Sequence, residues 1–203
     1  MEALEYVEIA KSRDEGRYNL TGIYRDTERL VATDGHRLHM VDGMPKIDKP
    51  HFLDGRDSQF PCYETVLLKN PTLVCSVKFE AKDIKRMKAF LGLYERKANR
   101  GVWISCTHEK GFVIESSPEE KDWSARMTFP CEESRCDRAF KIGVNLQYVI
   151  EALVPMKTFA AEFYVENTAS NGAETSRVLN IVYPVMKSTA LIMGMKMEEP
   201  SDD

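Results

Sequence analysis

No apolar run in this sequence approaches the roughly 18 residues that a membrane-spanning helix requires. The opening residues, Met1-Glu-Ala-Leu-Glu5, lack the basic start of a secretory signal peptide. The sequence also contains no glycine-rich loop of the kind that cradles a nucleotide phosphate. These absences exclude helical membrane proteins and P-loop proteins, and they predict a soluble, cytoplasmic protein with no membrane partner.

The chain also lacks the basic excess that is typical of proteins held to DNA through phosphate contacts. Its 28 Lys and Arg residues are outnumbered by 32 Asp and Glu residues, for a net charge of −4. Any contact with DNA must therefore be local. A length of 203 residues, with 43% hydrophobic and 30% charged residues, is typical of one or two globular domains.

Cysteine is present, but its spacing does not predict a metal site. The five cysteines are odd in number and irregularly spaced, which favours free thiols in a reducing compartment. Cys131 and Cys136 lack a second pair at zinc-finger spacing, and Cys62, Cys75 and Cys106 are scattered along the chain. We therefore expect no metal ion and no cofactor.

The most informative segment is the hexapeptide Thr33-Asp-Gly-His-Arg-Leu38. Its apolar flanks predict two buried strands joined by a tight connection, in which Gly35 can take a positive φ. This arrangement places His36 and Arg37 at the rim of a sheet, where side chains can contact a partner.

Periodicity along the chain predicts an α+β fold. Helical spacing of apolar residues predicts helices at 3–12, 80–94 and 146–154, the last capped by Asn145. Strands are predicted at 19–25, 29–33, 37–41, 101–107, 111–116, 124–129, 139–144, 160–166, 177–182 and 190–195. Prolines and Asp-Gly-type breaks predict an extended connector over 43–70. Across residues 77–197 the predicted order of elements is βαβββ, repeated twice.

Each predicted helix is expected to bury one face. In the first helix Leu4, Val7 and Lys11 are expected to share one side. The expected buried stripe of the second is Ile84, Met87, Leu91 and Tyr94, and the expected apolar face of the third is Leu146, Val149, Ile150 and Leu153.

Five segments together resemble the bacterial replicative sliding clamp, the β subunit of DNA polymerase III. Besides the hexapeptide, and in the family's order, they are Asn19-Leu-Thr-Gly-Ile-Tyr24, parts of 54–71, Val144-Asn-Leu-Gln-Tyr-Val-Ile150 and Ala190-Leu-Ile-Met-Gly-Met-Lys-Met197. The resemblance covers roughly residues 2 to 197 and matches the first half of the family's middle domain and its C-terminal domain. We therefore expect a shortened form of the clamp.

The resemblance implies the DNA clamp (processivity-factor) fold, built from βαβββ half-repeats. Residues 1–71 would form an incomplete clamp domain (αβββ plus linker), residues 72–197 a complete C-terminal-type domain, and residues 198–203 an acidic, disordered tail. The implied function lies in DNA replication, where the chain would act as a processivity factor. Its partners would be the clamp-binding motifs of DNA polymerase and of the clamp loader.

The resemblance further implies a hydrophobic groove that binds short linear peptides. The expected groove residues are Leu20, Thr33, Gly35, His36, Arg37, Leu38, Pro61, Val66, Asn145, Tyr148, Leu179, Met193, Gly194 and Met195. Apolar walls would take Leu or Phe anchors, while Arg37, Asn145 and Tyr148 would bond the peptide backbone or a Gln side chain. Gly194 stands where the family has proline, so the preferred clients are expected to differ.

A basic face on the predicted helix 80–94 is a candidate DNA contact. The residues expected there are Lys78, Lys82, Lys85 and Arg86, opposite the buried face. In clamps, helices hold duplex DNA through phosphate contacts that are independent of sequence. A solvated helix face accounts for the same pattern, and the first predicted helix is acidic, so both interpretations stay open.

Alternatives to a processivity clamp also stay open. One is an adaptor or decoy that keeps the groove without encircling DNA and regulates replication proteins. Another is a small nuclease or hydrolase that uses Asp34 and His36, but no nucleophile accompanies this pair, so we expect a non-enzyme without catalytic residues. A homo-oligomer is a further hypothesis, because three copies would supply six units of a ring, whereas an uncompleted first region predicts a monomer or small dimer.

Overall fold

The computed structural model describes residues 2–93, 100–107, 111–116, 124–134, 140–154, 160–166, 178–195 and 197. The helices in this part of the chain are α1 (Ala3–Glu8), α2 (Ala81–Leu91), α3 (Leu146–Leu153) and the 3-10 helices η1 (Glu15–Leu20), η2 (Tyr63–Val66) and η4 (Pro184–Met186). The strands are β1 (Tyr24–Arg25), β2 (Arg29–Thr33), β3 (Arg37–Asp42), β4 (His51–Phe52), β5 (Pro71–Lys78), β6 (Gly101–Thr107), β7 (Gly111–Ser116), β8 (Ala125–Phe129), β9 (Glu133–Ser134), β10 (Phe140–Asn145), β11 (Ala160–Glu166), β12 (Val178–Tyr183) and β13 (Ser188–Met193).

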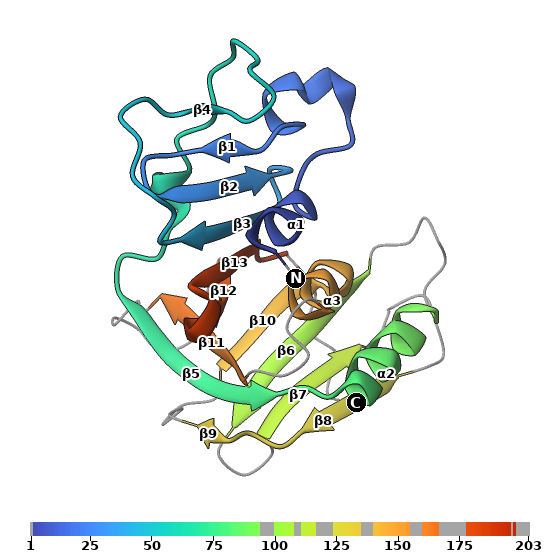
Figure 1. Cartoon of the computed structure of the whole chain (residues 1–203). Helices are drawn as coiled ribbons and strands as arrows, with labels where there is room; N and C mark the ends of the chain where they lie inside the picture. The colour runs from blue at the N-terminus through green and yellow to red at the C-terminus, as the bar shows by residue number, and fades with distance from the viewer. Residues whose placement is uncertain are drawn as a thin grey trace.

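The strands form two antiparallel sheets (Figure 1). The larger sheet has the order β4-β1-β2-β3-β13-β12-β11-β5-β9, and the smaller has the order β10-β6-β7-β8. Helices α2 and α3 pack against each other, α3 also contacts β10 and β13, and α1 lies on β2 and β3. No helix among the described residues is long and apolar enough to cross a lipid bilayer.

Residues 71–193 contain the predicted βαβββ unit twice, as β5-α2-β6-β7-β8 and as β10-α3-β11-β12-β13. The first strand of each unit joins the sheet of the other unit, because β5 pairs with β11 and β10 pairs with β6. Each unit therefore completes the sheet of its partner, and the two share one core that includes Phe79, Phe112 and Phe163.

The first region joins this body through β3 and β13. Residues 37–41 pair with residues 188–192, so the larger sheet runs without a break across the predicted domain boundary. On the core side of this sheet, Val7 and Ala10 from the first region share the main core with Ile192 and Leu146. The division at residues 71 and 72 stays a prediction, since the sheet and core are common to both sides.

Two helix starts follow the capping signals in the sequence. The Asn145 side-chain oxygen accepts a hydrogen bond from the Gln147 backbone N–H at 3.0 Å, as the prediction requires. Helix α2 begins with a capping box formed by Glu80 and Asp83. The buried faces of both helices are largely as predicted, with Phe90 buried where Leu91 was expected. Tyr94 lies outside the described residues.

Some predicted elements are wrong. The predicted strand 19–25 begins as the end of η1, because the Asp14 carboxylate accepts a hydrogen bond from Gly16 and starts a helical turn; only Tyr24–Arg25 is strand. Helix α1 ends at Glu8 and buries Tyr6, while Leu4 is exposed.

The predicted connector 43–70 holds β4 and η2 instead of being extended throughout. Its aromatic residues Phe52, Phe60 and Tyr63 are buried, and this packing fixes the segment against the outer face of the larger sheet.

Candidate functional site at the turn between β2 and β3

Side chains of the hexapeptide hold the turn between β2 and β3. The Thr33 hydroxyl donates to the Arg37 carbonyl at 2.6 Å and accepts from the Gly35 N–H at 3.0 Å. The Asp34 carboxylate accepts from the backbone N–H groups of His36 and Arg37 at 2.9 and 3.0 Å. Gly35 has a φ of +89°, as predicted for this position. These bonds give the Asp34 carboxylate a structural role in the turn.

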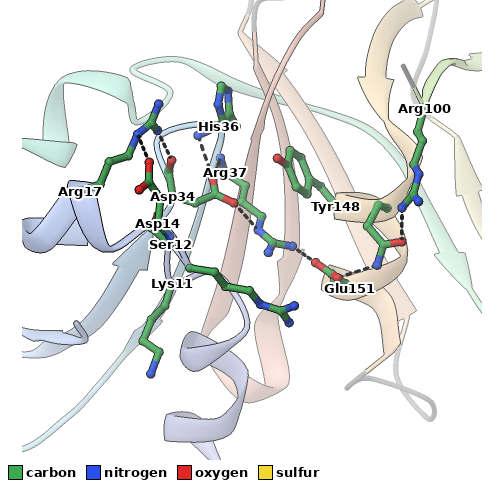
Figure 2. A pocket seen from close by; sticks show the side chains of 12 residues that line it. Lys11, Ser12, Asp14, Arg17, Asp34, His36, Arg37, Arg100, Tyr148 and Glu151 are labelled. Atoms are coloured by element: carbon green, nitrogen blue, oxygen red, sulfur yellow. Dashed lines mark hydrogen bonds and ion pairs between the residues drawn. The ribbon is translucent and has the colours of Figure 1, made fainter. Parts of the chain in front are cut away.

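Arg37 occupies the centre of the site, with a side chain that is only 9% exposed (Figure 2). Its guanidinium pairs with Asp34 at 3.2 Å and with Glu151 of α3, and it donates to the Ile9 carbonyl at 2.8 Å. It also lies 4.5 Å from the centre of the Tyr148 ring. Burial lowers the pKa of the Arg37 guanidinium, whereas the nearby Asp34 carboxylate raises it.

The prediction that Arg37 bonds a peptide stays a prediction, but its guanidinium is already engaged within the chain. A buried guanidinium must satisfy its donors and balance its charge, and here Asp34, Glu151 and the end of α1 do so. Arg37 instead ties together α1, the turn and α3, and it supports the face of Tyr148.

A polar cavity of about 510 Å³ opens beside this cluster. It is bordered by Lys11, Ser12, Arg13, Asp14, Arg17, Asp34, His36, Arg37, Arg100, Gln147, Tyr148 and Glu151, of which five are cationic and three are carboxylates. His36, Arg37 and Tyr148 are the predicted groove residues on this border. Tyr148 is half-buried, and burial is the main cause of its raised pKa.

Next to the turn, a second apolar cluster covers the face of the larger sheet that points away from the main core. This outer cluster consists of the buried residues Val31, Leu38, Met40, Phe52, Phe60, Tyr63 and Leu191. Met193 is partly buried and packs against it, while Val66 at the end of η2 is exposed. Pro61, between the buried Phe60 and η2, is exposed as well. Of the predicted groove residues, Leu38 thus belongs to the outer cluster, Met193 packs against it, and Val66 ends the short helix that contributes Tyr63 to it.

The segment after β13 is fixed beside the turn. The Met193 N–H donates to the His36 carbonyl at 2.9 Å, and the Met195 N–H donates to the Gly143 carbonyl at 2.8 Å. A side chain at Gly143 would lie 3.0 Å from the Met195 carbonyl oxygen and 2.7 Å from the Met197 sulfur, so glycine allows this close approach. Met193, Gly194 and Met195 therefore run from the turn to β10, and all three are partly buried.

The prediction of Leu179 as a groove residue is wrong. Leu179 is fully buried in the main core, opposite Ile192 in the ladder between β12 and β13. Successive side chains of a strand point to opposite faces, so its neighbour Val178, which pairs with Met193, faces the outer cluster. The alternation of side chains between the two faces of β12 is the sequence signal that could have distinguished the inward-facing Leu179 from the outward-facing Val178.

The remaining predicted residues are placed close to the turn. Leu20 ends η1 and lies 3.9 Å from the position that a side chain at Gly35 would occupy. Thr33 is buried and its hydroxyl is engaged in the turn, so it shapes the site without facing solvent. Asn145 is half-buried at the start of α3.

Comparison with known proteins yields one consistent likeness. No protein-family model matches the chain. A curated beta sliding clamp from Proteus mirabilis is 23% identical in an alignment 215 positions long, which covers 83% of this chain and 57% of that protein. The solved sliding clamp of Bacillus subtilis matches with a TM-score of 0.74 at 14% identity, covering 97% of this chain and 62% of its own. For the DNA polymerase III beta subunit of Thermotoga maritima the TM-score is 0.70 at 16% identity, with 97% and 63% covered.

The chain has the sliding clamp fold. The α+β architecture and the resemblance predicted from five short segments are confirmed. The chain spans less than two thirds of the length of each of these clamps.

Within this clamp fold, the four predicted DNA-binding residues are exposed and lie at or near helix α2. Two of them have acidic partners: Lys82 lies 2.8 Å from Glu80, and Arg86 lies 3.6 Å from Asp83. Lys78 precedes the helix and Lys85 lies between these pairs. The predicted face exists, and its contact with DNA remains a proposal.

Several cavity residues were not predicted from the sequence. Gln147 and Glu151 stand one turn apart on α3, with Glu151 also one turn after Tyr148, so helical spacing could have placed them beside the predicted tyrosine. Arg17 offers no such signal, because its bond to the Asp34 carbonyl at 2.9 Å exists only in the folded chain.

The expectation of scattered cysteines is also corrected. Cys75, Cys106 and Cys131 are far apart in the sequence, but their sulfur atoms lie within 4.8 Å of one another. Spacing along the chain could not reveal this cluster, because its members come from both sheets. Cys136 lies outside the described residues.

Proposed function

We propose that this chain is a sliding clamp-like protein of DNA replication that binds short linear motifs of DNA polymerase and clamp-loader proteins. The observation that carries the proposal is the convergence of His36, Tyr148 and Met193, from three distant segments, beside one turn in a clamp fold. These three segments are among the five that carry the sequence resemblance.

The surroundings suit an extended peptide with apolar anchors. Leu or Phe side chains would lie over the outer cluster, where Val66 and Met193 offer apolar contacts and methionine adapts its shape to different partners. The Tyr148 hydroxyl and the Asn145 amide would bond the peptide backbone or a Gln side chain. Arg37 contributes by holding Tyr148 in place, since its own donors are engaged within the chain.

Fluorescence anisotropy with a labelled Gln-Leu-Xaa-Leu-Phe peptide tests this site. We expect micromolar or tighter binding that Tyr148→Ala or Met193→Ala weakens by roughly fivefold or more, because truncating a central contact costs more than about 1 kcal/mol. Val185→Ala is the matched control: it removes an exposed apolar side chain at the opposite end of the β12–β13 hairpin. Absence of binding, or equal binding of a scrambled peptide, would refute the proposal.

A clamp-like adaptor that does not encircle DNA is a second candidate. The observation that favours it is charge: Glu2, Glu5 and Glu8 are exposed on α1, and two of the four basic residues at α2 are paired with acids. Acidic side chains repel phosphates, so a lumen that included α1 would bind DNA weakly. Peptide binding without measurable binding of a labelled duplex at low salt would identify the adaptor.

Assembly separates the ring from the adaptor. Light scattering coupled to size exclusion, at several protein concentrations, gives the mass of the particle. A discrete trimer of 23.2 kDa chains would favour a processivity ring, because head-to-tail contacts must close by symmetry or run on into filaments. A monomer at all concentrations would favour the adaptor.

A further inference from the structure

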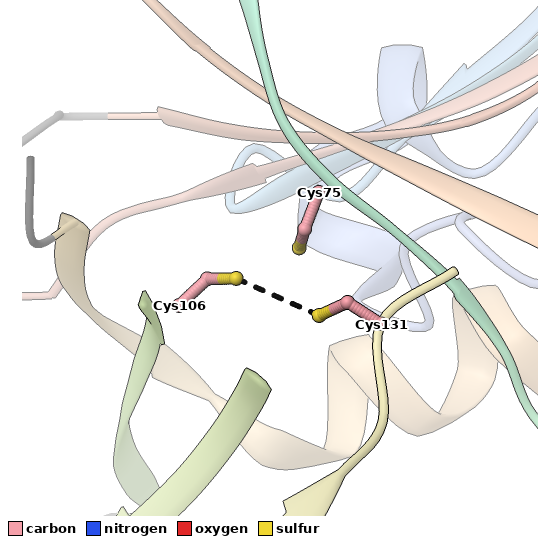
Figure 3. A group of neighbouring side chains, drawn as sticks. All are labelled: Cys75, Cys106 and Cys131. Carbon is pink, nitrogen blue, oxygen red and sulfur yellow. Dashed lines mark hydrogen bonds between the residues drawn. The ribbon is translucent and has the colours of Figure 1, made fainter. Parts of the chain in front are cut away.

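Three thiols meet between the two sheets, away from the candidate peptide site (Figure 3). Cys75 lies on β5 of the larger sheet, Cys106 lies on β6 of the smaller sheet, and Cys131 follows β8. The three sulfur atoms lie within 4.8 Å of one another, and those of Cys106 and Cys131 are 3.7 Å apart. The four described cysteines form no disulfide.

This geometry matches what a thiolate-bound metal ion requires. A zinc–sulfur bond is about 2.3 Å long, which places ligand sulfurs about 3.8 Å apart in tetrahedral geometry and about 4.0 Å apart in trigonal geometry. The observed separations bracket these values, so an ion could be bound with small side-chain adjustments.

We propose that Cys75, Cys106 and Cys131 form a three-thiolate site for one soft metal ion, of which Zn²⁺ is the representative. Sulfur ligands select soft ions such as Zn²⁺ and Cu⁺ over the hard ions Mg²⁺ and Ca²⁺. The ion would join the two sheets at a point where no covalent link joins them.

The surroundings of Cys131 provide both access and support. Cys131 is half-buried, whereas Cys75 and Cys106 are buried, so an ion can enter from the Cys131 side. A backbone hydrogen bond from Phe112 reaches the Cys131 thiol and favours its thiolate. Gly111 permits this approach, because a side chain there would lie 2.6 Å from the Phe129 carbonyl oxygen.

The folded chain disfavours the thiolate forms of Cys75 and Cys131. Hydrogen bonding with Cys106 raises the pKa of both the Cys75 and the Cys131 thiols, and burial raises them further. Each thiol that ligates the ion must therefore release one proton, and the apparent affinity for the ion should rise with pH. An ion held by surface carboxylates would not show this dependence near neutral pH.

The test uses the full chain, fully reduced and freed of metal by a chelator. Native mass spectrometry after addition of Zn²⁺ should show one ion per chain, and titration with Cd²⁺ should give the ultraviolet charge-transfer band of cadmium–thiolate bonds. Cys131→Ser and Cys75→Ser should each weaken binding at least tenfold. Cys62→Ser is the matched control, because Cys62 is exposed and outside the cluster, and it should bind the ion normally.

Three results would overturn the site: no ion on the reduced, folded chain; an ion bound without the thiolate band; or equal loss of the ion in Cys62→Ser. Circular dichroism establishes that each variant is folded. If Cys75→Ser does not fold, Cys131→Ser carries the test, since its half-buried position tolerates the change best. Buried cysteines that only fill space would give the first of these results.

Discussion

Basic residues occupy two contrasting places in this protein. At the junction of β3 with α1 and α3, Arg37 and His39 are buried, with Arg37 on the border of the polar cavity and His39 fully enclosed. On α2, Lys82, Lys85 and Arg86 are exposed, and their acidic neighbours lie at the surface or near it. Both places contain basic residues in the sequence. Burial in the structure shows that the side chains of the first place stabilise the fold, whereas those of the second are exposed to solvent, where a partner can reach them.

The comparison teaches that a basic residue in a conspicuous motif can stabilise the fold itself. Arg37 belongs to the most informative segment of the sequence, but its guanidinium is committed to Glu151, Asp34 and the Ile9 carbonyl. The exposed cations of α2 lie in a less distinctive segment and are better placed for phosphates.

The largest effect should come from removing the buried charge. We expect Arg37→Ala to lower the free energy of unfolding by about 3 kcal/mol or more, because it leaves the partly buried Asp34 and Glu151 carboxylates without their counter-charge. Urea denaturation followed by circular dichroism measures this change. The control is Lys11→Ala on the same cavity, whose pair with Glu8 is at the surface and contributes about 1 kcal/mol at most. An equal loss in free energy of unfolding for the two variants would show that the buried Arg37 stabilises the fold no more than the surface Lys11 does.

The second effect concerns pH and the buried imidazole. His39 stacks on Tyr6 with 4.6 Å between ring centres, and burial lowers its pKa from 6.5 to about 4. In the unfolded chain the His39 imidazole therefore binds a proton near pH 6.5, whereas in the folded chain it does so only near pH 4. Stability should be constant above pH 7 and should fall by up to about 3 kcal/mol as the pH drops through this window.

Replacing the imidazole tests this assignment. His39→Phe keeps an aromatic ring beside Tyr6 but removes the titrating group and its bond to the Tyr6 carbonyl. Denaturant titrations at a series of pH values should show a flatter curve between pH 6.5 and 4 for the variant than for the natural chain. A parallel pair of curves would show that carboxylates alone cause the acid sensitivity.

The smallest effect on stability should come from α2, where the effect on DNA binding should be largest. Lys82→Ala with Lys85→Ala should change the free energy of unfolding by no more than about 0.5 kcal/mol, as expected for exposed positions. If the face binds DNA, the slope of log affinity against log salt should fall by about 0.9 for each phosphate that the variant no longer neutralises. Lys141→Ala is the control, because Lys141 lies over Trp103 on the smaller sheet, away from α2.

A duplex that binds the double variant and the natural chain with the same salt slope would refute the DNA-contact proposal for α2. The peptide site would be unaffected by that result, since none of its residues lies on this helix.

Much of the fold was predictable because local signals agree with tertiary packing. The βαβββ order, the cap at Asn145 and the buried faces of α2 and α3 follow from periodicity and capping chemistry. The two-residue strands β4 and β9 could not be predicted in the same way, because so short a strand is stabilised by its partner and not by its own sequence. The helical turn of η1 was missed because the glycine and asparagine around it disfavour helix.

The candidate site was predictable in outline and not in its atomic roles. The resemblance predicted one groove lined by His36, Tyr148 and Met193. In the structure His36 and Tyr148 border one cavity and the Met193 N–H donates to the His36 carbonyl, while peptide binding there stays a prediction. It could not show that Leu179 faces inward, which depends on strand register, or that Arg37 is satisfied by Glu151, which depends on how α3 packs on the turn. The cysteine cluster depends on the packing of one sheet on the other, and no local pattern predicts it.

The pairing of β3 with β13 also constrains how the chain reaches its folded state. Strand β3 is made early in synthesis, but the strand that completes its edge is made far later, and β5 likewise waits for β11. Until then the ribosome-bound chain displays open strand edges rich in apolar residues, which readily pair with other chains. We therefore expect the chain to fold cooperatively and only after β13 has been synthesised. Before that point the incomplete chain gains little stability from the strands already made, and it depends most on chaperones.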